Sequence, residues 1–263
     1  MKNKQLFTWC VIGLVLSFVA PDSVFAWGQE GHRIIGEIAY RHLTPVARCR
    51  VNNVLGKHGL VYWANWPDEI KSDTIYPQSH NWHYQDLDGG MTDSAVVATL
   101  THYPTEGGNL WRATDSLKQV LKHNRSNYDA LRFLIHLEGD RFCPMHTAHM
   151  DDKGGNAVKM KWFGQNRNLH SVWDSGIIDA RGYTYSEYAE CLENQYRVER
   201  RSIEKMSDEE VLLHNYHLCE AIYAYQQTWN GNAYNYVYRF KDDMEWNLYA
   251  AGIRLAKILN ALY

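Results

Sequence analysis

Apolar residues recur along much of the chain at the spacing of an α-helix. Ile35, Ile38 and Ala39 stand at positions i, i+3 and i+4, and the segment from Leu131 to Ile135 repeats the arrangement. This spacing gives a helix one apolar stripe, which is stable only when it is buried against other elements. The pattern therefore predicts an amphipathic helix at each place.

Two longer helices are predicted in the last quarter of the chain. Ser207 followed by Glu210 has the spacing of a capping box, so one helix should begin at Asp208 and continue to Thr228. The final helix is expected from about Asp243 to Leu262. The residues expected on its buried side are Trp246, Tyr249, Ala250, Ile253, Leu255, Ala256 and Leu259.

Signals for β-strands are few, and two stretches have the composition of surface loops. Residues 89–108 are rich in Gly, Thr and Asp, and residues 151–155 form the second stretch. The sequence contains no internal repeat and no low-complexity linker. We therefore expect one all-α, mainly helical catalytic domain over residues 27–263.

The first 26 residues have the features of a secretory signal peptide. Lys2 and Lys4 precede an apolar stretch at residues 6–20, and residues 24–26 (Val-Phe-Ala) fit a cleavage site. No other run approaches the roughly 20 apolar residues that cross a bilayer. We expect an exported soluble protein, periplasmic or extracellular, that has no membrane anchor and begins at Trp27.

The charge of the mature chain excludes one class of function. The full chain has 27 basic and 30 acidic residues, and removing two lysines and Asp22 leaves 25 against 29, a net charge of −4. Such a chain lacks the positive surface needed for tight, sequence-independent binding to duplex nucleic acid. If it acts on phosphates, metal ions are the obvious source of positive charge.

Four cysteines remain after the signal peptide: Cys49, Cys143, Cys191 and Cys219. In an oxidising compartment they could form two disulfides, with three possible pairings, or they could remain free buried thiols. None belongs to a C-x-x-C pair, so the sequence does not indicate a cysteine zinc site.

Histidines stand at metal-ligand spacing from aspartates in two places. His136 and Asp140 are four residues apart, as are His170 and Asp174, so on a helix each pair shares one face. His146 lies between the pairs in a P-x-H segment. A single pair is usually a surface hydrogen bond or salt bridge, but the combination indicates a metal site because imidazole and carboxylate are good zinc ligands.

Two further candidates lie upstream, among aromatic residues. Asp68 is found in N-W-P-D-E-I-K and His83 in N-W-H-Y-Q-D-L. Taken alone, Asp68 has the features of a helix cap and His83 those of a packed histidine. Together with the downstream pairs they indicate the other half of a metal cluster.

These motifs, in this order, resemble the trizinc single-strand-specific nuclease family of the nuclease P-one and S-one type. The matching motifs are Trp27 with His32, W-x-D-x-I-K, W-H-Y-x-D, H-x-x-x-G-D, P-x-H followed by D-K-G-G-N, N-L-H-S-x-W-D and the closing A-G-x-R-L-A-x-x-L-N. The resemblance covers the whole mature chain. It implies the helical fold that this family shares with the zinc phospholipase C enzymes.

The resemblance also implies a set of nine metal ligands. The first zinc ion would be bound by Asp68, His83, His136 and Asp140, the second by Trp27, His32 and the other oxygen of Asp140, and the third by His146, His170 and Asp174. Trp27 would bind through its free α-amino nitrogen and its carbonyl oxygen. That amine exists only after the signal peptide is removed, so export and metal loading would be coupled.

The activity that the resemblance implies is hydrolysis of single-stranded DNA and RNA to 5′-phosphate products, together with 3′-nucleotidase activity. Asp86 would orient or activate the attacking water, and Lys71 would stabilise charge on the phosphoryl oxygens. Tyr84 would stack on a nucleobase, which favours unpaired strands. Without the motif, Lys71 would be interpreted as a solvated surface lysine. No stable protein partner is implied.

Some residues depart from the family pattern or compete with its ligands. Pro67 precedes Asp68 where the family more often has alanine, and Glu138 adds an acid within the H-x-x-x-D pair. His149 lies close to His146, but the P-x-H context favours His146 and leaves His149 as a surface residue. The histidines outside every motif are expected to be ordinary polar or packed residues: His42, His58, His80, His102, His123, His214 and His217.

Two alternative functions remain open on the sequence alone. A zinc phospholipase C would share the fold and the ligand types, but the N-L-H-S-x-W-D motif, Lys71 and Tyr84 favour a nuclease. A non-catalytic exported zinc-binding protein would need the ligands but neither Lys71 nor Asp86.

Overall fold

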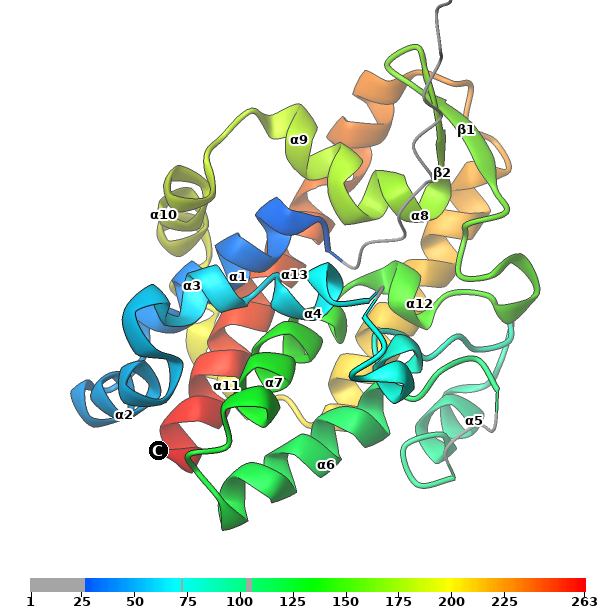
Figure 1. The fold of residues 1–263 in the computed structure, drawn as a ribbon. Coiled ribbons are helices and arrows are strands. Elements are labelled where there is room, and N and C mark those ends of the chain that lie inside the picture. The colour runs from blue at the N-terminus through cyan, green and yellow to red at the C-terminus, as the bar shows by residue number, and fades with distance from the viewer. Residues whose placement is uncertain (1–26, 72, 103–105) are drawn as a thin grey trace, which may run out of the picture.

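The computed structural model describes residues 27–71, 73–102 and 106–263 of the chain. The predicted signal peptide lies outside these residues. The described part is mainly helical, as the apolar pattern predicted, and its helices pack around one another with a single short hairpin at one end (Figure 1).

The elements and their bounds follow the order of the chain. The helices are α1 (Gln29–Arg41), α2 (Pro45–Leu55), α3 (Gly59–Trp63), α4 (Trp66–Glu69), α5 (Asp93–Ala98), α6 (Leu110–His123), α7 (Tyr128–Asp140), α8 (Leu169–Ser171), α9 (Ile177–Arg181), α10 (Tyr185–Tyr196), α11 (Arg200–Lys205), α12 (Asp208–Gln226) and α13 (Ala233–Leu262). Short 3₁₀ turns cover Gly56–His58, Pro77–Asn81, Pro144–Thr147 and Met150–Asp152, and a π-helical turn covers Val172–Gly176. The strands are β1 (Lys159–Trp162) and β2 (Gln165–Asn168).

The long C-terminal helix α13 forms the centre of the fold. It packs against α1, α7, α10 and α11, and most of its second half is buried (Figure 1). Helix α1 approaches it closely, because a Cβ atom at Gly252 would lie only 2.5 Å from Cγ2 of Ile38. The close approach attaches α1 directly to the centre of the fold.

The predicted helix starts are confirmed at one place and wrong at another. Helix α12 begins at Asp208, and Ser207 and Glu210 form the expected capping box. Helix α13, however, begins at Ala233, ten residues before the predicted start at Asp243. Its first turns carry exposed aromatic residues, which obscure the apolar period in the sequence.

The prediction of an uninterrupted loop at residues 89–108 is also wrong in part. Helix α5 (Asp93–Ala98) lies within it, capped by the side chain of Thr92, which accepts a hydrogen bond from the Ala95 N–H group. Val96 is fully buried and attaches this helix to the rest of the protein. A single buried residue in six gives too little periodicity to detect in the sequence.

The hairpin β1–β2 is antiparallel and pairs Lys159 with Asn168 and Trp162 with Gln165. Its two turn residues, Phe163 and Gly164, both have positive φ, as tight two-residue hairpin turns require. No helix in the described ranges is both long enough and apolar enough to cross a membrane.

Candidate metal centre

Four segments that are distant in the sequence supply the side chains of the first cluster. Helix α1 contributes His32, α4 contributes Asp68, and α7 contributes His136 and Asp140. His83 follows the 3₁₀ turn Pro77–Asn81. All five side chains are buried.

Asp140 lies at the middle of this cluster. Its Oδ2 atom is 3.1 Å from Nδ1 of His83 and 3.3 Å from Nε2 of His136. Its other oxygen, Oδ1, is 3.3 Å from Nε2 of His32. Each oxygen of this carboxylate therefore faces a different set of imidazoles.

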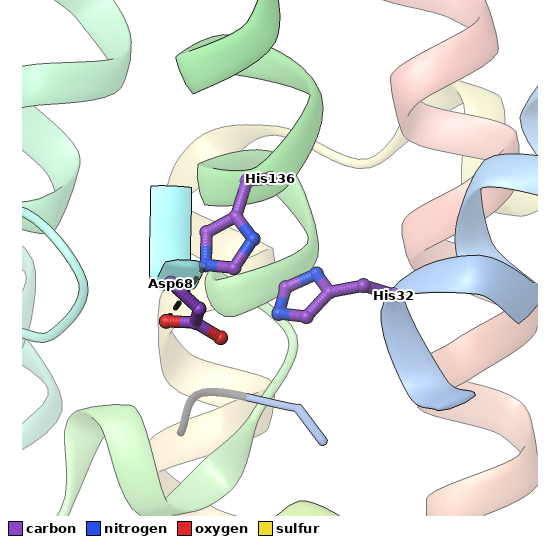
Figure 2. A group of neighbouring side chains, drawn as sticks. All are labelled: His32, Asp68 and His136. Carbon is purple, nitrogen blue, oxygen red and sulfur yellow. Dashed lines mark ion pairs between the residues drawn. The ribbon is translucent and has the colours of Figure 1, made fainter. Parts of the chain in front are cut away.

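Asp68 is the second carboxylate of the first cluster. Its Oδ1 atom lies 3.6 Å from Nε2 of His136 and 3.7 Å from Nδ1 of His83. Figure 2 shows Asp68, His136 and His32 converging from three elements, and the ring of His32 stacks on that of His136 at 3.8 Å.

A hydrogen bond behind the ring fixes the orientation of each of two histidines. Nδ1 of His136 donates to the Ala64 carbonyl at 2.7 Å, so Nε2 is left with a lone pair that faces the cluster. Nδ1 of His170 donates to the Gly154 carbonyl at 2.6 Å with the same consequence. Such outer contacts orient metal-binding histidines and set their tautomer.

A second group lies around Asp174. Helix α8 and the π-helical turn Val172–Gly176 place Nε2 of His170 3.2 Å from Oδ2 of Asp174. Nε2 of His146 is 3.9 Å from Oδ1 of the same residue, and Nδ1 of His146 is 3.7 Å from Oδ1 of Asp140. His146 thus links the two groups.

Trp27 is fully buried. The N–H group of the next residue, Gly28, donates to the carbonyl of Asp174 at 2.6 Å. The beginning of the predicted mature chain is therefore attached to the segment that supplies the second group.

The spacing of the polar atoms suits bound metal ions. Two ligands at 2.0–2.1 Å from a tetrahedral zinc ion lie about 3.3–3.4 Å apart. Half of the His–Asp separations above are close to that value, at 3.1–3.3 Å, and the other half are 3.6–3.9 Å. Several of these buried atoms form no hydrogen bond: His32 Nε2, Asp140 Oδ1, His146 Nδ1 and His170 Nε2. Buried polar atoms without a partner are costly, so the donor set fits a group of cations.

The protonation states of two of the histidines suit metal binding, whereas, against the effect of burial, Asp140 raises the pKa of His136 and Asp174 raises that of His170. Burial lowers the pKa of His83 to about 4 and that of His146 to about 3, so both imidazoles are neutral at neutral pH. Burial alone would raise the pKa of Asp140, but His136 and His146 together hold it well below its usual range. Neutral imidazoles and ionised carboxylates are the forms that bind zinc.

A cleft of about 630 Å³ opens onto the centre. Its walls include three residues that the sequence singled out besides the ligands, Lys71, Tyr84 and Asp86. Nζ of Lys71 lies 2.6 Å from Oδ1 of Asp68. Burial raises the pKa of Asp86 to about 7, so this carboxyl group can exchange a proton near neutral pH.

Two competing residues lie outside the centre. Glu138 is fully buried, but it accepts a hydrogen bond from Arg141 at 2.8 Å on another side of α7. His149 forms an ion pair with Glu220 at 2.5 Å and stacks on Tyr223, so it is half-buried and not the surface residue expected from the sequence.

Sequence reasoning missed two residues of the site. His80, expected to be an ordinary polar residue, lines the cleft. Cys143 is buried with Sγ 3.5 Å from Oδ1 of Asp174, and burial raises its thiol pKa well above the usual range. The one feature of the sequence that could have placed Cys143 at the site is its position directly before the P-x-H segment. All four cysteines in the described part of the chain are free, so none forms a disulfide. Cys143 and Cys219 are the buried thiols that one alternative expected, whereas Cys49 and Cys191 are exposed.

The fold and this centre define a helical protein whose described residues contain three buried groups that could bind metal ions: His32, Asp68 and His136; His83, His136 and Asp140; and Cys143, His146 and Asp174. The family model of the S1/P1 nucleases matches residues 27–263, so the chain belongs to the S1/P1 nuclease family. It is therefore a hydrolase of the nuclease class that acts on nucleic acids.

Similar proteins include plant and fungal nucleases. Endonuclease 3 of Arabidopsis thaliana is 27% identical over 98% of this chain and 96% of its own length. Endonuclease 2 of the same plant is 30% identical over 64% of this chain and 61% of its own length. Nuclease S1 of Aspergillus oryzae is 26% identical over 70% and 67%, respectively.

Proposed function

We propose that this protein hydrolyses single-stranded DNA and RNA to 5′-phosphate products with the help of three zinc ions, and that it also acts on 3′-nucleotides. The observation that carries the proposal is the convergence of buried imidazoles and carboxylates beneath a cleft that also contains Lys71, Tyr84 and Asp86. Membership of a nuclease family favours this function over phospholipid hydrolysis.

The chain offers a ligand set for each of three ions. The first set is Asp68, His83, His136 and Asp140, the second is Trp27, His32 and Asp140, and the third is His146, His170 and Asp174. When bound, zinc would supply a Lewis acid for the phosphoryl oxygens and would lower the pKa of water at the site. The third set has only three protein ligands, which would leave one position of a tetrahedral ion for substrate or water.

Lys71 is suited to stabilise negative charge on the phosphate. Its side chain lines the cleft and is held by Asp68, whose own side chain is buried in the first cluster. An ammonium group in this position faces the place where a phosphoryl oxygen would gain charge in the transition state.

Asp86 is suited to accept the proton of the attacking water. Its carboxyl group is only 7% exposed and lines the same cleft, and burial brings its pKa to about 7. A general base works best when its pKa lies near the working pH.

Tyr84 supports the preference for unpaired strands. Its half-buried ring forms part of the cleft wall, next to His83. Stacking on one base is worth roughly 1–3 kcal/mol and does not depend on the identity of the base. A base that stacks here must first leave its pairing partner, which costs least in a single strand.

Metal analysis combined with activity assays tests the proposal. Protein that begins at Trp27 should contain three zinc ions per chain and should release 5′-nucleotides from single-stranded DNA and RNA. It should leave phosphatidylcholine intact. A protein without bound transition metal that still cleaves the strand would contradict the proposed ligand roles, and hydrolysis of the lipid alone would favour the phospholipase alternative.

The role proposed for Trp27 has its own test. We propose that export, to the periplasm or the extracellular space, and cleavage before Trp27 create the α-amino ligand. Protein with one extra glycine before Trp27 should bind fewer zinc ions and lose most activity, while Trp27→Phe should retain both, because only backbone atoms are required. Full zinc content in the extended protein would exclude the terminal amine as a ligand.

A further inference from the structure

A second groove adjoins the cleft along the hairpin β1–β2. It has a volume of about 490 Å³ and is lined by residues of both strands, among them Lys161 and Arg167. Lys159 lines the cleft and the groove alike, so the two adjoin at this residue, and together they are called the path below. Figure 1 shows the hairpin projecting at the end of the molecule beyond α8.

Positive charge is concentrated along this path. Its cationic side chains are Lys71, Lys153, Lys159, Lys161 and Arg167, and Asp86 is the one acidic side chain among the described residues that line it. The mature chain as a whole has more acidic than basic residues. The path therefore differs in sign from the average surface, and it suits a polyanion.

The hairpin lysines are not neutralised by neighbouring acids. Nζ of Lys159 donates to the carbonyl of Asn156 at 3.2 Å, and Nζ of Lys161 donates to Oδ1 of Asn166. Both acceptors are neutral. Within the described part of the chain neither lysine forms an ion pair, so both keep their full charge for a ligand.

The hairpin holds these two ammonium groups on one face. Along β1, exposed Lys159 and Lys161 alternate with buried Met160 and Trp162. Residues two apart on a strand are roughly 6.8 Å apart, a spacing that suits successive phosphates of an extended strand. The ring of Trp162 packs against Tyr236 and fixes the hairpin to α13.

We propose that the exposed face of β1 binds the phosphates of nucleotides beyond the scissile bond, with Lys159 and Lys161 each contacting one phosphate. The inference rests on the proposed nuclease function and specifies its substrate: a strand of several nucleotides, bound more tightly than a mononucleotide. A 3′-nucleotide carries no further phosphates and cannot extend from the cleft to the hairpin.

Binding of a labelled, uncleavable phosphorothioate DNA strand of ten nucleotides tests this directly. In the zinc-loaded protein, Lys159→Gln/Lys161→Gln should raise the Kd about tenfold at low salt. It should also reduce the slope of log K against log salt by about 1.4, since each single-strand phosphate contact contributes about 0.7. The matched control Lys57→Gln/Lys205→Gln removes two exposed lysines outside the path and should behave as the wild type.

Kinetics complete the test. In Lys159→Gln/Lys161→Gln, KM should rise more for a cleavable strand than for a 3′-nucleotide, and the factor for the strand should be at least three times the factor for the nucleotide. In Lys159→Arg/Lys161→Arg, KM for the strand should return to the wild-type value. Equal Kd and salt slope in the double variant and the control would overturn the inference, as would equal KM changes for strand and mononucleotide. Wild-type protein that binds the strand through these lysines but hydrolyses nothing would support the inference and refute the proposed function.

Discussion

At the scale of single residues, the centre combines groups whose protonation states complement one another. The imidazoles of His83 and His146 are kept neutral by burial, while the carboxylate of Asp140 is kept ionised by the histidines around it. The hydrogen bond from His136 to Ala64 then directs the free ring nitrogen inward. Side chains in these states are ready to bind a cation without a large rearrangement.

Asp86 should make the stability of the zinc-free protein depend on pH. The pKa of its carboxyl group is about 7 in the folded protein and near 3.8 in the unfolded chain. Between pH 3.8 and pH 7, unfolding therefore releases a proton, and the free energy of unfolding falls as the pH rises through this range. Asp86→Asn should therefore be stabilising, by little at pH 4 and by at most about 4 kcal/mol at pH 8. Urea unfolding in EDTA measures the difference, and an equal effect at both pH values would contradict it.

Lys71 should contribute to the chemical step more than to the fold. Lys71→Ala should lower kcat about 10²–10³-fold on single-stranded DNA, which is typical for loss of one group that stabilises transition-state charge. Lys71→Met should have the same effect, because it removes the charge but retains the volume of the side chain. Zinc content should stay at the wild-type value in both. A variant with full activity would return Lys71 to the role of a surface lysine.

At the scale of elements, α7 performs two tasks on two of its sides. One side carries His136 and Asp140 into the metal centre, and another carries Glu138 towards Arg141. Gly139 lies between them, and a Cβ atom there would lie 3.1 Å from Nδ1 of His32. The glycine of the H-x-x-x-G-D motif therefore allows His32 of α1 to approach α7.

The buried network beside α7 should be costly to break on one side only. Arg141 pairs with Glu138 at 2.8 Å and with Asp208 of α12 at 2.7 Å. Arg141→Leu should destabilise the protein by about 3–5 kcal/mol, because it leaves the buried carboxylate of Glu138 uncompensated. Glu138→Leu/Arg141→Leu should be less destabilised than Arg141→Leu in urea unfolding. If Glu138→Gln lost zinc, Glu138 would have to be a ligand.

At the scale of the whole molecule, the metal centre brings together polar side chains from segments whose other contacts are packing contacts in the hydrophobic core. Helices α1, α4 and α7 and the segments around His83 and His170 each contribute a side chain to one of the two neighbouring groups of polar atoms. Ions bound there would replace unfavourable contacts between buried polar atoms by strong ligand bonds. Metal binding and global stability are therefore expected to be coupled.

Removal of zinc should lower the melting temperature substantially. Free zinc at about 1,000 times its Kd contributes roughly 4 kcal/mol per site, and 1 kcal/mol corresponds to about 2–4 °C in a chain of this size. Protein dialysed against EDTA should thus melt on the order of 10 °C lower or more, and added zinc should restore the transition. Calorimetry of both forms measures the shift; identical transitions would contradict the coupling.

Local patterns in the sequence predicted those parts of the fold that depend on neighbouring residues. The capping box at Ser207 located the start of α12, and the apolar spacing around Ile35 located α1. The start of α13 was missed because Tyr234 and Tyr238 are exposed aromatic residues, and periodicity alone cannot distinguish them from core residues. Helix α5 was missed because one buried residue, Val96, makes no detectable period.

The sequence by itself determined the helical class and the i, i+4 pairing of His136 with Asp140 and of His170 with Asp174, since these follow from residue type and from the geometry of one helix. Only the tertiary structure decided that His32, Asp68 and His83 meet the α7 pair, that Glu138 faces Arg141, and that the hairpin extends the cleft with positive charge. Those outcomes depend on how helices cross and which side chains are buried between them. Such contacts join residues far apart in the chain, and no local pattern encodes their distances.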